Sequence, residues 1–273
     1  MIPISSEWMT ATATILMLVS VRIFGFFLVM PLFAFRAMPL RMRLVLALAV
    51  TLMLAPSVQT RYPAEAMAQM APGYVLVGLE LAIGAAAGFM VRLGFMVIDL
   101  LAEVLSAQAG LSFASTFSQD PALVSGLTGE FLGMVALALA FVMNLHIALL
   151  GMLLGSFQAL PFGVWPGAWS LEAVVGLFRE AFSLGLVLSL VPIVVYMMFN
   201  LTQAVLVRVS PQLNLFAIGF PIMVPVAFVV IAMLLPSMPD IVQRAMEAPA
   251  RVIKLGLEKP AATPPSPSAP ATK

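Results

Sequence analysis

The sequence predicts an all-α integral membrane protein made of helical hairpins, some of them broken or not fully membrane-spanning. Of its 273 residues, 62% are hydrophobic and 9% are charged, and the mean hydropathy is +1.10. A soluble domain needs a hydrated surface, and this composition leaves too few polar residues to build one. Prolines and charges interrupt several apolar runs, and lipid cannot satisfy the backbone groups that they free. We therefore expect the hairpins to pack with partner subunits.

The composition also excludes several classes of function. The formal net charge of +1 gives no reason to expect nucleic acid as a partner. The chain has no cysteine and a single histidine, and it contains no HExxH, GxSxG or P-loop pattern. Asp99 and Asp120 lack the flanking glycines that an intramembrane aspartyl site needs to unwind its helix. We expect no enzyme activity, no metal and no cofactor.

The first predicted span covers residues 9–35 and carries Arg22 near its middle. A charge at that depth is costly, so Arg22 should face a protein partner or water. The loop after this span contains three arginines without an acid: Arg36, Arg41 and Arg43. The positive-inside rule places this loop in the cytoplasm and the N-terminus outside.

The next apolar run, Leu44–Ala55, is too short to span unless residues from Pro39 onward are included, and it is typical of half a hairpin. Residues 57–71 suit an outside loop. From Gly73 to Ser118 the chain has no proline. As one helix this run would be about 70 Å long at 1.5 Å per residue, so it must turn or leave the bilayer.

Two patterns lie within that long run. Gly84 and Gly88 form a GxxxG pair, which favours close approach of another helix. Arg92, Asp99 and Glu103 are spaced by seven and four residues, which places all three on one helical face. This buried charge stripe is a set of salt bridges among its own residues, a contact to another subunit or a proton relay. The sequence leaves these three interpretations open.

Small residues and two phenylalanines dominate the stretch Gln108–Pro121, which is either a connecting loop or a re-entrant segment. Residues 131–155 predict a clean span that contains Asn144 and His146, and a lone histidine is most often a packing residue. The uncharged stretch Ser156–Trp169 carries tryptophans and prolines and predicts a turn at the membrane interface.

Residues 181–207 predict another span, interrupted by Pro192, and Arg208–Pro225 follows as the most unusual stretch of the chain. Inside a helix, Pro221 and Pro225 would leave the carbonyls of Ala217 and Pro221 without donors. The backbone is therefore either broken against other protein or kinked within a packed helix. We expect residues 1–240 to form the helical membrane domain, 241–258 a segment on the cytoplasmic side, and 259–273 a disordered proline-rich tail.

Three stretches resemble the FliR family of flagellar and virulence type III secretion export-gate proteins. The first contains Pro31, Phe33, Pro39, Arg41, Arg43 and the run Ala55–Ser57. The second, within Gly84–Gly163, contains Gly110–Ala114, Asp120, Pro121, Asn144, His146, Ser156, Phe157, Leu160 and Pro161. The third, RVSPQLNLFAIGFP, is similar to the family signature almost residue for residue, through Arg208, Pro211, Gln212, Asn214, Phe216, Gly219 and Pro221. The chain departs from the family at Pro225, where a glycine-containing run is more usual.

The resemblance implies a non-enzymatic subunit of an export gate in the bacterial inner membrane, at the flagellar basal body. It implies FliP-like and FliQ-like membrane proteins and FlhB-like and FlhA-like export components as partners, with unfolded proteins as the exported substrates. It also implies that the signature residues from Arg208 to Pro221 pack the helices of a hairpin together. It implies further that a loop plugs the closed pore. That loop contains Gly110, Leu111, Ser112, Phe113, Ala114, Phe117 and Asp120.

Two other functions stay open from the sequence alone. Broken helices and intramembrane charges are also typical of a secondary transporter of a small solute. Such a transporter should contain internal repeats, and the sequence shows no convincing one. A purely structural scaffold is the third interpretation, and it predicts that substitutions at Phe113 change neither conductance nor export.

Overall fold

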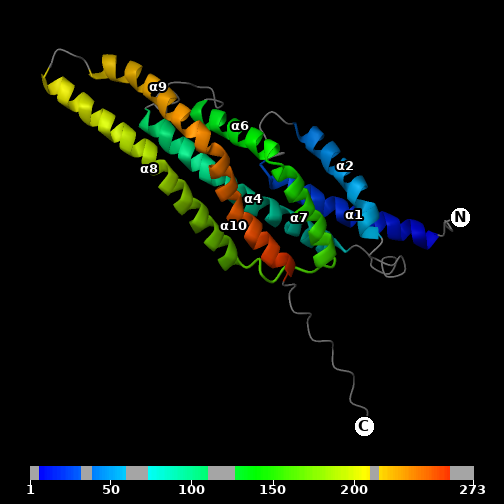
Figure 1. The fold of residues 1–273 in the computed structure, drawn as a ribbon. Coiled ribbons are helices and arrows are strands. Elements are labelled where there is room, and N and C mark those ends of the chain that lie inside the picture. Colours follow the sequence, from blue (N-terminus) through cyan, green and yellow to red (C-terminus); the bar gives the residue numbers. More distant parts are fainter. Residues whose placement is uncertain (1–5, 32–38, 60–72, 110–126, 210–214, 259–273) are drawn as a thin grey trace, which may run out of the picture. The chain divides into compact units, whose positions relative to one another are not determined.

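The computed structural model describes residues 6–31, 39–59, 73–109, 127–209 and 215–258, and their regular structure is helical throughout (Figure 1). The helices are α1 (Ser6–Val29), α2 (Leu40–Gln59), α4 (Tyr74–Gln108), α6 (Leu127–Val142), α7 (Leu145–Ala159), α8 (Leu171–Val209), α9 (Leu215–Leu234) and α10 (Met238–Glu258), with a 3₁₀ turn, η2, at Leu235–Ser237. Five helical stretches in this part of the chain are long and apolar enough to cross a membrane. The predicted all-α membrane class is confirmed.

Helices α1 and α2 pack against each other and form the first hairpin. Helix α2 begins at Leu40, directly after Pro39, and its 20 residues reach the length that a membrane span needs. Pro56 lies inside its last turns at an exposed position, where the helix tolerates the missing donor. The apolar run from Leu44 is therefore part of a full-length helix.

Helix α4 confirms that the proline-free run is longer than the bilayer is thick. It contains 35 residues, or about 52 Å at 1.5 Å per residue, against a hydrocarbon core of about 30 Å. It ends at Gln108, where the run of small residues begins. The predicted loop from Gly110 onward lies outside the described residues.

The predicted span over residues 131–155 is not one continuous helix. Two helices, α6 and α7, replace it, and the break falls at Met143 and Asn144. Asn144 has a φ of 57°, and asparagine is one of the few residues that adopt this left-handed conformation at low cost. The ring of His146 contacts that of Phe141 with centroids 5.0 Å apart, as expected of a packing histidine.

Prolines lie inside the last helices without ending them, although each lacks the N–H that would donate to the carbonyl four residues earlier. Helix α8 begins at Leu171, ten residues before the predicted span, and continues through Pro192. Helix α9 includes Pro221 and Pro225, so the backbone is helical at both prolines, and residues 210–214 of the same stretch lie outside the described residues. Their four-residue spacing puts both defects on one helical face, where neighbouring groups can satisfy the freed carbonyls.

Helix α10 is strongly two-sided, with charged residues on one face and buried apolar residues on the other, including Ile241, Val242 and Ala245. It begins at Met238, so no structural break falls at residue 240. Pro249 lacks a donor for the carbonyl of Ala245. A Cβ placed on Gly94 of α4 would lie 2.6 Å from that carbonyl oxygen, so the glycine allows the two helices to meet there.

Contacts between Cα atoms divide the chain into two compact units. Unit 1 consists of Met1–Arg92, Ile147–Val175 and Ala250–Lys273, and unit 2 of Leu93–His146 and Gly176–Pro249. Within its described residues, unit 1 holds α1, α2 and most of α7, and unit 2 holds α6 and α9. Helices α4, α8 and α10 each contribute one part to each unit.

Candidate functional site

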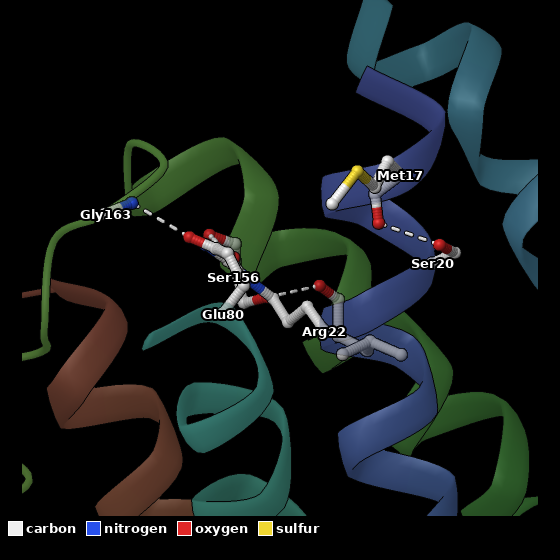
Figure 2. A network of polar contacts seen from close by, with 7 residues as sticks. Met17, Ser20, Arg22, Glu80, Ser156 and Gly163 are labelled. Carbon is white, nitrogen blue, oxygen red and sulfur yellow. Dashed lines mark hydrogen bonds and ion pairs between the residues drawn. The ribbon is translucent and has the colours of Figure 1, made fainter. Parts of the chain in front are cut away.

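A fully buried ion pair in unit 1 links α1 to α4. The Nε atom of Arg22 donates to Oε2 of Glu80 at 2.6 Å, and neither side chain is exposed at all (Figure 2). Each residue is the only charged one within a long apolar stretch of its helix, so its own helix offers it no nearby partner of opposite charge. The prediction that Arg22 faces protein instead of lipid is confirmed.

The turn between α7 and α8 provides a second hydrogen-bond donor to the carboxylate of Glu80. The backbone N–H of Gly163 donates to Oε1 of Glu80 at 2.8 Å. Gly163 has a φ of 83°, in the left-handed region that a side chain rarely adopts, so glycine suits this turn. Figure 2 shows the turn aiming this N–H at the carboxylate. Both oxygens of Glu80 therefore have donors.

Helix α7 and the turn after it provide the remaining contacts of the guanidinium. Nη1 of Arg22 donates to the carbonyl oxygen of Ser156 at 3.2 Å and lies 3.4 Å from its hydroxyl. The guanidinium carbon lies 4.6 Å from the ring centroid of Phe157 and 5.7 Å from that of Phe162, within cation–π range. Nη2 has no hydrogen-bond partner among the described residues. A cavity of about 10 Å³ borders Arg22 and Ser156, which is the size that one water molecule needs.

Glycines bring α1 and α4 close enough for this pair to form. A Cβ on Gly84 would overlap the carbonyl oxygen of Arg22, and a Cβ on Gly88 would lie 2.7 Å from that of Phe26. From the other side, a Cβ on Gly25 would overlap the carbonyl oxygen of Leu81. The GxxxG prediction is confirmed: these positions allow the two backbones to touch.

A tryptophan attaches the end of α10 to the same unit. Trp169 is 3% exposed, and its Nε1 donates to the carbonyl oxygen of Val252 at 3.3 Å. A Cβ on Gly256 would overlap the indole ring. In this chain Trp169 is a core residue, although the sequence predicted the stretch around it to lie at the membrane interface.

This cluster holds segments of the chain together. The two oxygens of Glu80 accept hydrogen bonds from Arg22 and from the backbone of Gly163, and Arg22 also donates to the carbonyl oxygen of Ser156. Among the residues that the structure describes, no group of His, Cys, Asp or Glu side chains could hold a metal ion. The cluster fixes α1, α4, α7 and the turn after α7 to one another.

The charge stripe does not have the predicted burial. Arg92, Asp99 and Glu103 all occupy exposed positions of α4, so the expectation of a buried stripe is wrong for this chain. The seven- and four-residue spacing does place them on one face, but within the described part of the chain these three positions stay exposed. A role in contacting another subunit stays a prediction.

The residues of the other two predicted sites lie largely outside the described part of the chain. The plug loop, from Gly110 to Asp120, falls wholly within residues 110–126. Of the signature residues, Arg208 is exposed in the last turn of α8, where a positive charge complements the helix dipole. Pro211, Gln212 and Asn214 lie outside the described residues, and Phe216, Gly219 and Pro221 belong to α9.

Sequence reasoning missed Glu80, the partner of Arg22. The signal was present, because Glu80 is the only acid between Glu65 and Asp99 and lies four residues before Gly84. A lone acid one turn from a GxxxG motif is a candidate partner for a lone arginine in the helix that the motif packs against.

The comparisons with known proteins agree with the resemblance. The family described as "Bacterial export proteins, family 1" matches residues 13–248. The chain is 32% identical to flagellar biosynthetic protein FliR of Escherichia coli over 214 residues, which cover 76% of this chain and 78% of the relative. It is 30% identical to the protein of that name from Pectobacterium carotovorum over 223 residues, covering 80% and 83%. It is also 30% identical to that of Caulobacter vibrioides over 209 residues, covering 76% and 82%.

Proposed function

The chain belongs to the bacterial export proteins, family 1, and from this premise we propose that it is a subunit of the flagellar type III protein export gate. The observation that carries the proposal is the extent of the match, which runs from residue 13 to residue 248 and includes every described helix in whole or in part. The named relatives are flagellar biosynthetic proteins, and they give no support to a transporter of small solutes.

The exposed apolar surface of the chain supports a subunit that works within an assembly. In α8, only 22% of the most apolar stretch is buried, and phenylalanines such as Phe178 and Phe182 stack at the surface, 48% and 43% exposed. Helix α8 contains 39 residues, about 58 Å at 1.5 Å per residue, so lipid alone cannot cover it. The part of α8 that extends beyond the bilayer is therefore surface for partner subunits.

We assign FliP-like and FliQ-like membrane proteins, with FlhB-like and FlhA-like export components, as the partners that cover this surface. The exposed charge stripe of α4 suits such a contact, since charges of both signs on one face can pair with a partner of matching pattern. The gate would stand in the bacterial inner membrane at the flagellar basal body, and its substrates would be unfolded proteins. The role is positional, and it requires no cofactor and no catalytic group.

The segment between α4 and α6 is proposed as the plug of the closed pore. Helix α4 ends at Gln108 and α6 begins at Leu127, so two rigid helices hold both ends of the segment. The segment carries Phe113 and Phe117, one helical turn apart in sequence, and bulky apolar rings exclude water and ions from a narrow passage.

If this segment is the plug, removing the ring of Phe113 should let ions leak through the closed gate. Phe113→Ala should raise the ion conductance of membranes that contain the assembled gate, because the smaller side chain leaves a wetted opening. Conductance is measured on membranes with the closed gate, and secretion of flagellar proteins into the medium is measured in the same strain. A strain without the chain should secrete none.

The matched control is Phe131→Ala, which removes an equally large ring from an exposed position of α6, outside the segment. It should leave conductance at the level of the parent. A Phe113→Ala gate as tight as the parent would contradict the plug, and normal secretion in the strain without the chain would contradict the export role itself.

A further inference from the structure

Helix α2 has a second apolar face, on the side away from α1. Its buried residues, Val50 and Leu54 among them, lie on the face that packs against α1 (Figure 1). On the opposite side of the helix, Val45, Leu48 and Leu52 are 65%, 56% and 59% exposed. Their spacing of three and four residues is that of a helix face which packs against another helix.

Two further residues extend this face at its ends. Arg41 precedes Val45 by four residues, Pro56 follows Leu52 by four, and both are exposed. At about 100° per residue, the five positions fall within about 80° of one another around the helix axis. We call Arg41, Val45, Leu48, Leu52 and Pro56 the α2 stripe. It has a cation at one end, a proline at the other and aliphatic side chains between them.

The proline end favours protein over lipid as the cover of the α2 stripe. Pro56 has no N–H, so the carbonyl of Leu52 lacks its regular donor within the helix. Lipid tails donate no hydrogen bond, whereas the polar side chains of a neighbouring helix do satisfy such freed carbonyls in membrane proteins. We therefore expect a protein segment with a donor side chain to lie at the level of Leu52.

The arginine end indicates the charge of the covering segment. Arg41 lies in the first turn of α2, which contains no acid, and the positive end of the helix dipole makes a cation unfavourable there. Within the described residues, Arg41 makes no hydrogen bond or ion pair. A carboxylate beside it would satisfy both positive charges, and it can accept two parallel hydrogen bonds from the guanidinium.

The two ends together define a spacing. Arg41 and Leu52 are eleven residues apart, which is about 16 Å along a helix at 1.5 Å per residue. A helix that packs along α2 would need a carboxylate and a donor side chain at about that separation, with apolar residues between them. An unfolded protein in transit does not hold two groups at a fixed distance. The spacing therefore fits a resident subunit better than an exported substrate.

We propose that the α2 stripe is the docking face for an apolar helix of a partner subunit. The carboxylate of this helix pairs with Arg41, and its donor side chain reaches the carbonyl of Leu52. The inference rests on the proposed export function for the presence of partner subunits, and it adds the surface and the chemistry of one contact. It involves a different helix from the exposed surfaces of α4 and α8.

A photo-reactive leucine analogue at position 48, in the middle of the α2 stripe, tests the contact in the whole apparatus. After illumination, mass spectrometry should find it cross-linked to a partner helix that has an acid at the level of Arg41. The same analogue at position 54 is the control, because Leu54 is only 6% exposed and lies on the face toward α1. It should cross-link within the chain.

Charge reversal tests the arginine. Arg41→Glu should weaken binding of the cross-linked subunit by at least about tenfold, the value of one charge-assisted hydrogen bond. Binding is measured by native mass spectrometry as the full chain is titrated with that subunit in mild detergent. Lys254→Glu, the same reversal at an exposed position of α10, should leave binding unchanged. Changing the acid of the partner to lysine should restore the binding of Arg41→Glu, which a misfolded variant would not show.

The proposal and the export function fail in different ways. Cross-links from position 48 to lipid or to exported substrates, or full binding by Arg41→Glu, would overturn the docking face and leave the export function standing. Secretion of flagellar proteins by a strain without the chain would overturn the export function instead, whatever position 48 contacts.

Discussion

Arg22→Ala is expected to destabilise the folded chain by about 3–5 kcal/mol, the usual cost of removing one partner from a buried ion pair. The variant leaves the carboxylate of Glu80 buried, with the N–H of Gly163 as its donor and the cation removed. It also removes the contacts of the guanidinium with Ser156 and Phe157. We expect the unfolding midpoint of the purified protein, measured by denaturant titration in detergent, to fall accordingly.

The matched control is Arg92→Ala, which removes an exposed arginine from α4 and should change stability by less than about 0.5 kcal/mol. A double variant tests the mechanism. Arg22→Met combined with Glu80→Gln leaves no unpaired charge and keeps an acceptor for the N–H of Gly163, so it should recover much of the loss. If the double variant is as unstable as Arg22→Ala, the loss does not arise from an uncompensated charge.

Gly84→Ala should have the second largest effect, a loss of at least about 2 kcal/mol, because overpacked contacts cost about 1–3 kcal/mol and this one involves backbone. The new Cβ would overlap the carbonyl oxygen of Arg22 and lie 3.0 Å from the backbone nitrogen of Phe26, so α1 and α4 must separate. Separation would also weaken the ion pair of Arg22 with Glu80, which depends on the close approach of these helices.

The same substitution six residues earlier provides the control. Gly78→Ala lies in the same helix with nothing within 4 Å of the new Cβ, and it should stabilise α4 by up to about 1 kcal/mol through helix propensity. Opposite signs at the two positions, read from denaturant unfolding, would support the close crossing. A neutral Gly84→Ala variant would show that α1 and α4 do not touch there.

The sequence predicted the membrane class and the constraint on Arg22, because both follow from the cost of placing polar groups in hydrocarbon. Its spacing patterns did not pair Arg22 with Glu80, because Glu80 lies 58 residues away and tertiary packing brings the two together. The lone acid beside Gly84 marks Glu80 only as a candidate partner. The close helix crossing at Gly84 was predictable from the GxxxG motif, because small residues allow the backbone of another helix to approach closely.

The helix boundaries were less predictable, since the outcome at a break depends on what neighbouring segments provide. Pro192, Pro221 and Pro225 were candidates for broken backbone, yet they lie within helices. The actual break is at Asn144, which has no proline beside it and ends a helix by adopting positive φ. Burial of the charge stripe at Arg92 was also wrong, because spacing predicts a shared face and does not predict what covers that face.

The central claim is that this chain is a gate subunit, whose exposed apolar helices are complete only among partner subunits. It is tested most directly by producing the full chain together with its FliP-like and FliQ-like neighbours and weighing the purified assembly by native mass spectrometry. We predict a complex of fixed stoichiometry that contains the chain. Recovery of the chain as a stable monomer, with the neighbours present and none bound, would contradict the account.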